Sequence, residues 1–155
     1  MKKSIHVDNK YRLAWLIFRV RTLLYRTRDK ELTSYDVKPR QAAVLIVASA
    51  IGDKATPAEI SRWLLREPHT VSGILDRMEK KGLVKRVKDL ERKNMIRVTL
   101  TEKGHKAHRA IRRKGVYHKI LGVLTEEEQG QLASLLTKIQ EKAVKVSDFK
   151  IPPFP

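Results

Sequence analysis

The sequence predicts a mainly α-helical domain that carries one small β-hairpin. Apolar residues recur at helical spacing through most of the chain, and helix start and stop signals divide it into separate helices. One segment, 96–100, instead alternates apolar and polar residues, which is typical of a half-buried strand. The 155 residues fit one domain better than two, and a hydrophobic fraction of 41% is enough to furnish a core.

The first helix is expected from Tyr11 to about Lys30, a segment without Pro or Gly. Its apolar side chains form two stripes at helical spacing: Leu13, Ile17, Val20 and Leu24 on one side, and Tyr11, Trp15, Phe18 and Tyr25 on another. A helix that is apolar on two faces is buried on two faces. We therefore expect the rest of the domain to cover one face and a second partner to cover the other.

Two shorter helices follow. Pro39 suits the first position of one helix, and Gly52 closes it. The next helix begins after Thr56, where Thr56 as N-cap and Glu59 as the residue that reaches back complete a capping box. We expect Pro68 to stop this helix, because a proline disfavours helical geometry in the residue before it.

A further helix is expected from Pro68 to Lys81, before Gly82. Its apolar residues are spaced at i, i+3, i+4 and i+7, so that they face inward together: Val71, Ile74, Leu75 and Met78. Because only a tight turn separates it from the preceding short helix, the pair forms a helix-turn-helix.

The strand signal lies in Ile96, Val98 and Leu100, which alternate with Arg97 and Thr99. We expect its partner strand at 84–88 and a connecting loop at 89–94. A long helix is then expected from Thr101 through about Leu121. A capping box at 125–128 begins the last helix, whose apolar residues share one face: Leu132, Leu135, Leu136, Ile139, Ala143 and Val146. The apolar tail at 149–155 is not helical.

Charge and cysteine content limit the function classes. The 34 Lys and Arg residues outnumber the 17 Asp and Glu residues, and the segment 77–119 holds sixteen basic residues against four acidic ones. Such a field attracts polyanions. The chain has no Cys, which excludes disulfides, Cys-ligated metals and cysteine nucleophiles. The apolar run 13–18 is too short for a membrane span or a secretion signal, so we expect a cytoplasmic protein.

The second helix of the helix-turn-helix has a polar outer face that suits DNA. His69, Gly73, Asp76 and Lys80 lie opposite its apolar residues, and Thr70, Ser72 and Arg77 flank them. Small residues permit close approach to a major groove, where His, Thr, Ser and Arg reach base edges or phosphates. A solvated polar face is the alternative interpretation.

The hairpin loop places Arg92, Lys93 and Asn94 at its tip. An arginine in a narrow minor groove, with a lysine on phosphate, is a common use of such a tip. An ordinary charged turn is the alternative, but directly after a helix-turn-helix the hairpin is better interpreted as a wing. The sequence thus predicts a winged helix-turn-helix flanked by long N- and C-terminal helices.

These residues resemble the MarR (multiple antibiotic resistance regulator) family of winged-helix transcription factors. The resemblance rests on the runs 39–41, 58–61, 70–72, 75–84 and 100–104, of which the central one is the most specific. It implies a homodimer that regulates transcription from pseudo-palindromic duplex DNA, with repression modulated by an unidentified small-molecule effector bound between the dimer helices and the winged helices. One departure is that Arg92 and Asn94 stand where the family usually has Asp-x-Arg in the wing.

We therefore expect a single domain over 1–155. Dimerisation helices and the tail occupy 1–33 and 120–155, the winged helix-turn-helix occupies 38–101, and a connecting helix occupies 102–121. The expected DNA-binding residues are Thr56, His69, Thr70, Ser72, Gly73, Arg77, Arg92, Lys93 and Asn94. The expected dimerisation residues are Trp15, Phe18, Leu132, Leu136 and Ile139.

Other functions fit the sequence less well. The high charge alone also suits a protein that packs nucleic acid without sequence preference, in which phosphate contacts replace base contacts. His105 and His108 have the spacing of half a metal site, but an isolated pair on a polar helix is more often solvent-exposed, and we expect no metal and no cofactor. Neither an enzyme motif nor an aromatic face for membrane binding occurs.

Overall fold

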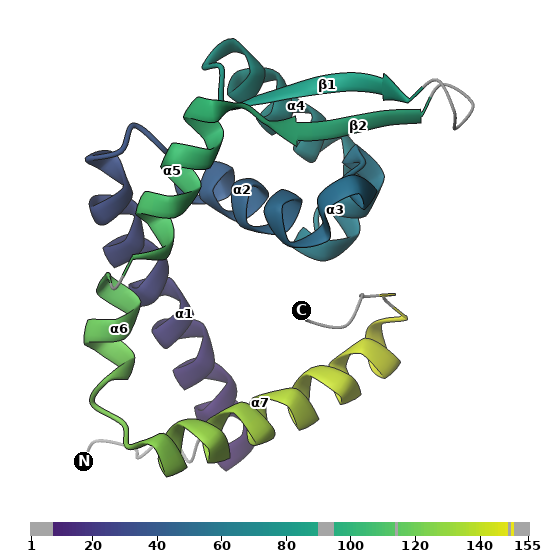
Figure 1. Cartoon of the computed structure of the whole chain (residues 1–155). Coiled ribbons are helices and arrows are strands. Elements are labelled where there is room, and N and C mark those ends of the chain that lie inside the picture. Colours follow the sequence, from purple (N-terminus) through teal and green to yellow (C-terminus); the bar gives the residue numbers. More distant parts are fainter. Residues whose placement is uncertain (1–7, 90–94, 114, 149, 151–155) are drawn as a thin grey trace, which may run out of the picture.

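The computed structural model describes residues 8–89, 95–113, 115–148 and 150 and confirms a mainly helical chain with a two-stranded wing (Figure 1). The elements in order are α1 (Asn9–Thr33), α2 (Pro39–Ile51), a 3-10 turn η1 (Gly52–Lys54), α3 (Pro57–Leu64), α4 (Pro68–Lys80), β1 (Val84–Asp89), β2 (Met95–Leu100), α5 (Glu102–Arg112), α6 (Val116–Leu121) and α7 (Glu126–Ser147). Helices α2 to α4 and the hairpin form one body. Helices α1 and α5 pack against α2 and extend away from this body, and α6 and α7 lie at its far side along α1.

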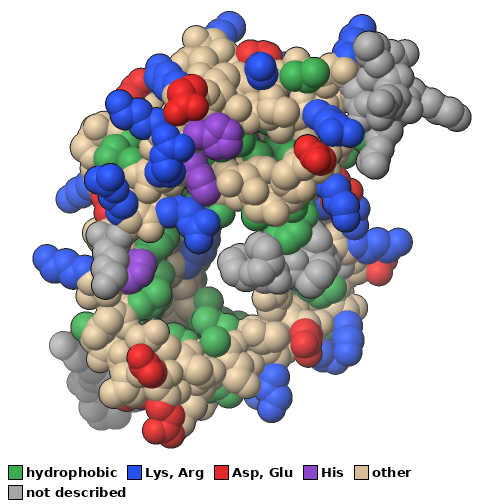
Figure 2. Space-filling view, in the orientation of Figure 1, with side chains coloured by type: hydrophobic (Ala, Val, Ile, Leu, Met, Phe, Trp, Pro, Cys, Tyr) green, Lys and Arg blue, Asp and Glu red, His purple; other side chains and the backbone are tan. Residues whose placement is uncertain are grey.

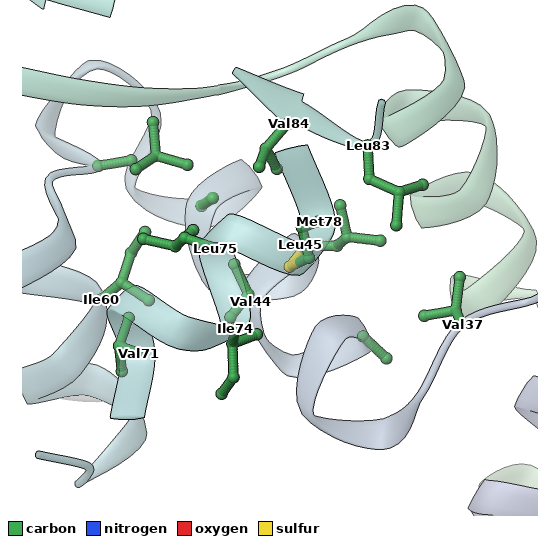
Figure 3. Packing of buried hydrophobic residues seen from close by; sticks show 14 of the residues in the cluster. Val37, Val44, Leu45, Ile60, Val71, Ile74, Leu75, Met78, Leu83 and Val84 are labelled. Atoms are coloured by element: carbon green, nitrogen blue, oxygen red, sulfur yellow. The ribbon is translucent and has the colours of Figure 1, made fainter. Parts of the chain in front are cut away.

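The hydrophobic core lies between α2, α3, α4 and the hairpin (Figure 3). The inner face of α4 contributes the four residues expected from its spacing, Val71, Ile74, Leu75 and Met78, none more than 2% exposed. They pack in one cluster with Leu45 of α2 and Ile60 of α3. This packing fixes the rotation of α4 about its axis and hence decides which of its residues face outward.

The hairpin is antiparallel and joins the two expected segments, with Val84 opposite Leu100 and Lys88 opposite Ile96. Each strand extends one residue further toward the tip than expected. Of the alternating β2 residues, Val98 is buried, and its N–H donates to the Ala55 carbonyl oxygen at 2.7 Å. That bond ties the strand to the turn before α3, so the wing is anchored at its base.

Two details of the expected helix ends are wrong. The Thr56 hydroxyl accepts a hydrogen bond from the Glu59 N–H, but the Glu59 carboxylate pairs with Arg62 at 2.6 Å instead of completing a capping box. Helix α3 also ends before Pro68 can stop it, because Leu65 adopts a left-handed conformation with φ 50°. Pro68 instead occupies the first turn of α4.

The expected single helix at 102–121 is divided into α5 and α6, with Arg113 and Gly115 in extended conformations between them. Contacts from α1 favour the break. Arg28 donates to the Ile111 carbonyl oxygen at 2.8 Å, and the Val116 N–H donates to Glu31 Oε1 at 2.9 Å. Arg28 and Glu31 also form an ion pair with each other, so together they satisfy the end of α5 and the start of α6.

A Cβ on Gly115 would overlap the Glu31 carboxylate, so a larger residue there must displace the end of that side chain from the break. The Tyr117 ring lies 5.0 Å from the Arg28 guanidinium and covers it. The break is therefore a joint between α1, α5 and α6, and it does not arise from weak helix propensity alone.

Both apolar stripes of α1 are largely exposed within a single chain, so the rest of the domain does not cover one of them as expected, and burial against a second partner stays a prediction. Only Arg28 and Leu32 of α1 are buried, whereas Trp15 is 61% and Phe18 is 51% exposed. Helix α7 begins with the expected capping box at Thr125 and Glu128 but has no buried residue. The two helices meet around an apolar groove of about 560 Å³. The tail residues Phe149, Ile151 and Phe154 lie outside the described residues.

The exposed area is large for the size of the chain. A compact monomer of 17.9 kDa exposes about 8000 Å², whereas this chain exposes 12505 Å². Figure 2 shows hydrophobic side chains around the hollow between α1 and α7. None of the described helices is long and apolar enough to cross a membrane.

Candidate nucleic-acid interface

Helix α4 presents its polar face outward, as its spacing predicts. His69, Ser72 and Arg77 are exposed, and Thr70 and Gly73 are half-buried. All five lie on one helix whose other face is locked in the core, so the structure places them on a common surface. Thr56 stands apart from them at the start of α3, where its hydroxyl oxygen caps that helix.

Gly73 leaves room on this surface. A Cβ at Gly73 would have only Arg77 Nη1 near it, at 3.7 Å, an ordinary van der Waals distance. The fold therefore does not require a glycine at this position. A small residue that packing does not demand is consistent with close approach of a partner to the outer face of α4.

Arg86 of β1 connects the wing to α4. Its guanidinium donates to Asp76 Oδ1 at 2.7 Å and to the Ser72 carbonyl oxygen at 3.2 Å, and its N–H donates to Glu79 Oε1 at 2.9 Å. Asp76 is thus occupied by a scaffold contact on the expected DNA-binding face. From the sequence, Arg86 was expected only as one of the positive charges. The signal for this bridge is the pair of carboxylates at i and i+3 on α4, next to the strand that follows.

In the view of Figure 2, Lys and Arg side chains gather over α5 and are spread over the winged-helix part, with Asp and Glu side chains among them. Some of this charge is used within the fold. Lys81 donates to both the carbonyl oxygen and the carboxylate of Asp36 at 2.8 Å, and Lys103 donates to the Lys81 carbonyl oxygen at 2.8 Å. The hydrogen bond and charge of Lys81 lower the pKa of Asp36. Other cations, including Lys85, are exposed.

The tip of the wing falls outside the described residues, and with it Arg92, Lys93 and Asn94. The described strands project away from the helical core toward that tip (Figure 1). The wing and the outer face of α4 are held in a fixed relation by Arg86 and by the pairing of β1 with β2.

His105 and His108 differ in their surroundings. His105 is exposed, whereas His108 is 9% exposed, and burial lowers the pKa of His108, with Arg112, His105 and Arg109 adding to the effect. Within the described part of the chain, no group of three or more His, Cys, Asp or Glu residues is placed to hold a metal ion.

Comparison with known proteins also indicates a DNA-binding transcriptional regulator. A family model described as the MarR family matches residues 35–93, which span α2 to β1 and most of the hairpin loop. The transcriptional regulator PecS of Dickeya dadantii is 25% identical over 130 residues, covering 81% of this chain and 78% of PecS. The transcriptional repressor MdtR of Bacillus subtilis is 29% identical over 109 residues, covering 69% of this chain and 70% of MdtR.

Solved structures agree over nearly the whole chain. The organohalide-sensing transcriptional regulator RdhR-CbdbA1625 in its 2,4-dichlorophenol-bound form is 29% identical, with a TM-score of 0.82 over 97% of this chain and 92% of that one. S. aureus MepR in complex with DNA is 25% identical, with a TM-score of 0.77 over 88% of this chain and 99% of that one. The chain therefore carries a MarR-family winged helix over residues 35–93, in a fold that it shares with DNA-binding transcriptional regulators of that family.

Proposed function

We propose that the protein is a ligand-responsive transcriptional repressor that binds a pseudo-palindromic DNA site as a homodimer. The observation that carries this proposal is the setting of α4, whose apolar face is locked in the core while its polar face is exposed beside the wing. His69, Thr70, Ser72, Gly73 and Arg77 contact base edges and phosphates in the major groove.

The wing tip and the start of α3 complete the proposed interface. Arg92 enters the minor groove, Lys93 and Asn94 contact the backbone, and Thr56 lies at the N-terminus of α3, where helix ends favour phosphate. The MepR structure in complex with DNA supports this use of the fold.

The uncovered faces of α1 and α7 support the homodimer. The area exposed beyond that of a compact monomer is about 4500 Å² per chain, ample for the roughly 2000–5000 Å² that obligate homodimers bury over both protomers. It includes Trp15 and Phe18, whose rings stack at 5.3 Å, and Leu132, Leu136 and Ile139 of α7. Exposed apolar patches of this kind mark interfaces on proteins in water. Twofold symmetry then places two α4 helices on successive turns of one face of the DNA.

Repression and the response to a ligand rest on the relatives and on a pocket. MdtR is a repressor, and RdhR is described with 2,4-dichlorophenol bound. In this chain a pocket of about 260 Å³ opens between α1, α2 and α4 and includes Tyr117 of α6. A ligand there touches both the proposed dimerisation helix and the DNA-binding part.

Selection of bound fragments from random duplex DNA tests the proposal. A shared inverted repeat is expected, and binding to it is expected to weaken by roughly 10³-fold between 50 and 200 mM salt if six to ten phosphates are contacted. Fragments without a common motif would instead identify a packing protein, because phosphate contacts alone carry no sequence preference.

Leu136→Asp tests the dimer. Leu136 is 43% exposed on the apolar face of α7, and a buried charge there is expected to abolish both dimerisation and binding to the full repeat. Ser134→Asp adds the same charge on the opposite face of α7 and is expected to leave both intact. Sedimentation of the parent protein as a folded monomer at micromolar concentration would contradict the proposal.

A further inference from the structure

Two adjoining pockets lie where α1, α2 and the turn between α3 and α4 meet. The first, which we name the cationic pocket, has a volume of about 260 Å³ and is lined by Arg21, Thr22, Tyr25, Arg26, Arg40 and Arg66. The second, the apolar chamber, is the pocket between α1, α2 and α4 described above. Arg21, Tyr25, Arg40 and Arg66 line both, so the two spaces form one continuous site.

The four arginines of the cationic pocket come from three separate parts of the fold: α1, the start of α2, and the turn before α4. Across residues 8–89, 95–113 and 115–148, none of them has a hydrogen bond or ion pair with another side chain, and no Asp or Glu lines either pocket. Several other arginines of the fold pair with carboxylates, as Arg62 does with Glu59.

The apolar chamber continues from this charged end among hydrophobic side chains, including Leu32, Ala42, Ile46, Leu64 and Ile74. Arg28 also reaches it, but its guanidinium is held by Glu31 and the Ile111 carbonyl oxygen. The chamber therefore offers apolar contact rather than further free charge.

A ligand that matches this site carries concentrated negative charge at one end. Guanidinium groups bind phosphate oxygens in bidentate fashion, and such charge-assisted hydrogen bonds are stronger than neutral ones. A neutral phenol leaves the mutual repulsion of four arginines uncompensated, and a carboxylate supplies one charge. A phosphate monoester supplies between one and two charges at neutral pH and three strong acceptor oxygens.

The size of the chamber limits the other end of the ligand. At about 260 Å³ it lies just below the usual range for ligand pockets. It has room for a single ring or a short aliphatic chain.

We propose that the two pockets bind one organic phosphate, with the phosphate group among Arg21, Arg26, Arg40 and Arg66 and a compact apolar body in the chamber. This inference rests on the ligand response proposed above and names the chemical class of the ligand. Tyr25 supplies a hydroxyl group at the rim of the phosphate end, whereas the Thr22 hydroxyl donates to the Phe18 carbonyl oxygen at 2.8 Å.

Calorimetric titration of the DNA-free, full-length protein with phenyl phosphate tests the inference. Phenyl phosphate is expected to bind at least about tenfold more tightly than phenol, benzoate or inorganic phosphate, because each of these lacks either the second charge or the apolar body. Equal affinity for phenol or benzoate, equal affinity for inorganic phosphate, or no binding of phenyl phosphate would overturn it.

Variants locate the binding site. Arg40→Gln and Arg66→Gln are each expected to weaken binding of phenyl phosphate by about tenfold or more. Arg62→Gln is the matched control, because Arg62 is exposed, pairs with Glu59 and lines neither pocket. Unchanged ligand affinity in both pocket variants would overturn the assignment.

Operator binding without any ligand is measured on the same variants. If Arg40→Gln and Arg66→Gln weaken operator binding while phenyl phosphate binds as before, the arginines of the cationic pocket contact DNA phosphates instead. The inference is then wrong. If the parent protein binds phenyl phosphate but selects no operator, the proposed function fails while the ligand class stands. If it selects an operator but does not bind phenyl phosphate, only the ligand class fails.

Discussion

Gly104, in the first turn of α5, is the glycine that the packing of the winged helix requires most strictly. A Cβ at this position would overlap the Leu83 carbonyl oxygen, lie 3.1 Å from the Leu83 carbonyl carbon and lie 3.4 Å from Leu100 Cβ. Leu83 is 2% exposed, and its carbonyl oxygen accepts a hydrogen bond from the Thr101 N–H at 3.1 Å. Gly104→Ala must therefore push the start of α5 away from the core.

The expected cost follows from these contacts. Over-packing of a well-packed site costs about 1–3 kcal/mol, and a buried backbone group left without its hydrogen bond costs about 1–3 kcal/mol. The better helix propensity of alanine returns about 1 kcal/mol. We expect Gly104→Ala to lower the free energy of unfolding by about 3 kcal/mol, a large part of the 5–15 kcal/mol typical of a domain.

Urea unfolding followed by circular dichroism measures this loss. Parent and variants are compared at one protein concentration, because a dimer couples unfolding to dissociation. Gly130→Ala is the matched control: nothing lies within 4 Å of its Cβ, and it lies opposite the apolar face of α7. It is expected to gain about 0.5–1 kcal/mol. A Gly104→Ala protein within 1 kcal/mol of the parent would refute the packing argument.

Three further predictions concern α4, the wing and α5. Gly73→Ala is expected to keep or slightly raise stability, because its Cβ meets no close contact, but to weaken operator binding several-fold in a gel-shift titration. Arg86→Met is expected to lower the free energy of unfolding by about 1–2 kcal/mol and to weaken operator binding, because it removes the bridge between β1 and α4. His108 has a lowered pKa in the folded protein, so below about pH 6.5 the unfolded chain takes up the proton first. Between pH 7.5 and pH 5.5, the free energy of unfolding is therefore expected to fall less for His108→Gln than for the parent. Equal decreases in the two proteins would contradict this.

Local signals in the sequence were sufficient to predict the helix-turn-helix and the hairpin. Val71, Ile74, Leu75 and Met78 are buried together because their spacing on one helix face leaves no other arrangement in a compact core. The strand at 96–100 also followed from alternation within a few residues, and its partner segment was expected next to it. The placement of the α4 residues proposed to bind DNA on one outer face is a consequence of the same periodicity.

The joint at Gly115 could not be derived in this way. It depends on Arg28 and Glu31, which lie more than eighty residues earlier in the chain and reach the break only in the folded protein. The local signal was the glycine itself, within an otherwise helical pattern. Glu59 failed to close its capping box for a similar reason, because Arg62, one turn further along α3, competes for the carboxylate.

Helix α1 also has a mechanical consequence. Its 25 residues make a rod about 37 Å long, with the proposed dimer contacts at one end and the Arg28–Glu31 joint near the other. A tilt of about 5° at the dimer end moves the far end by about 3 Å, close to the 3.4 Å step between neighbouring base pairs. In the proposed dimer, the length of the rod would therefore convert a rotation of a few degrees into a shift of one α4 helix by about one base pair.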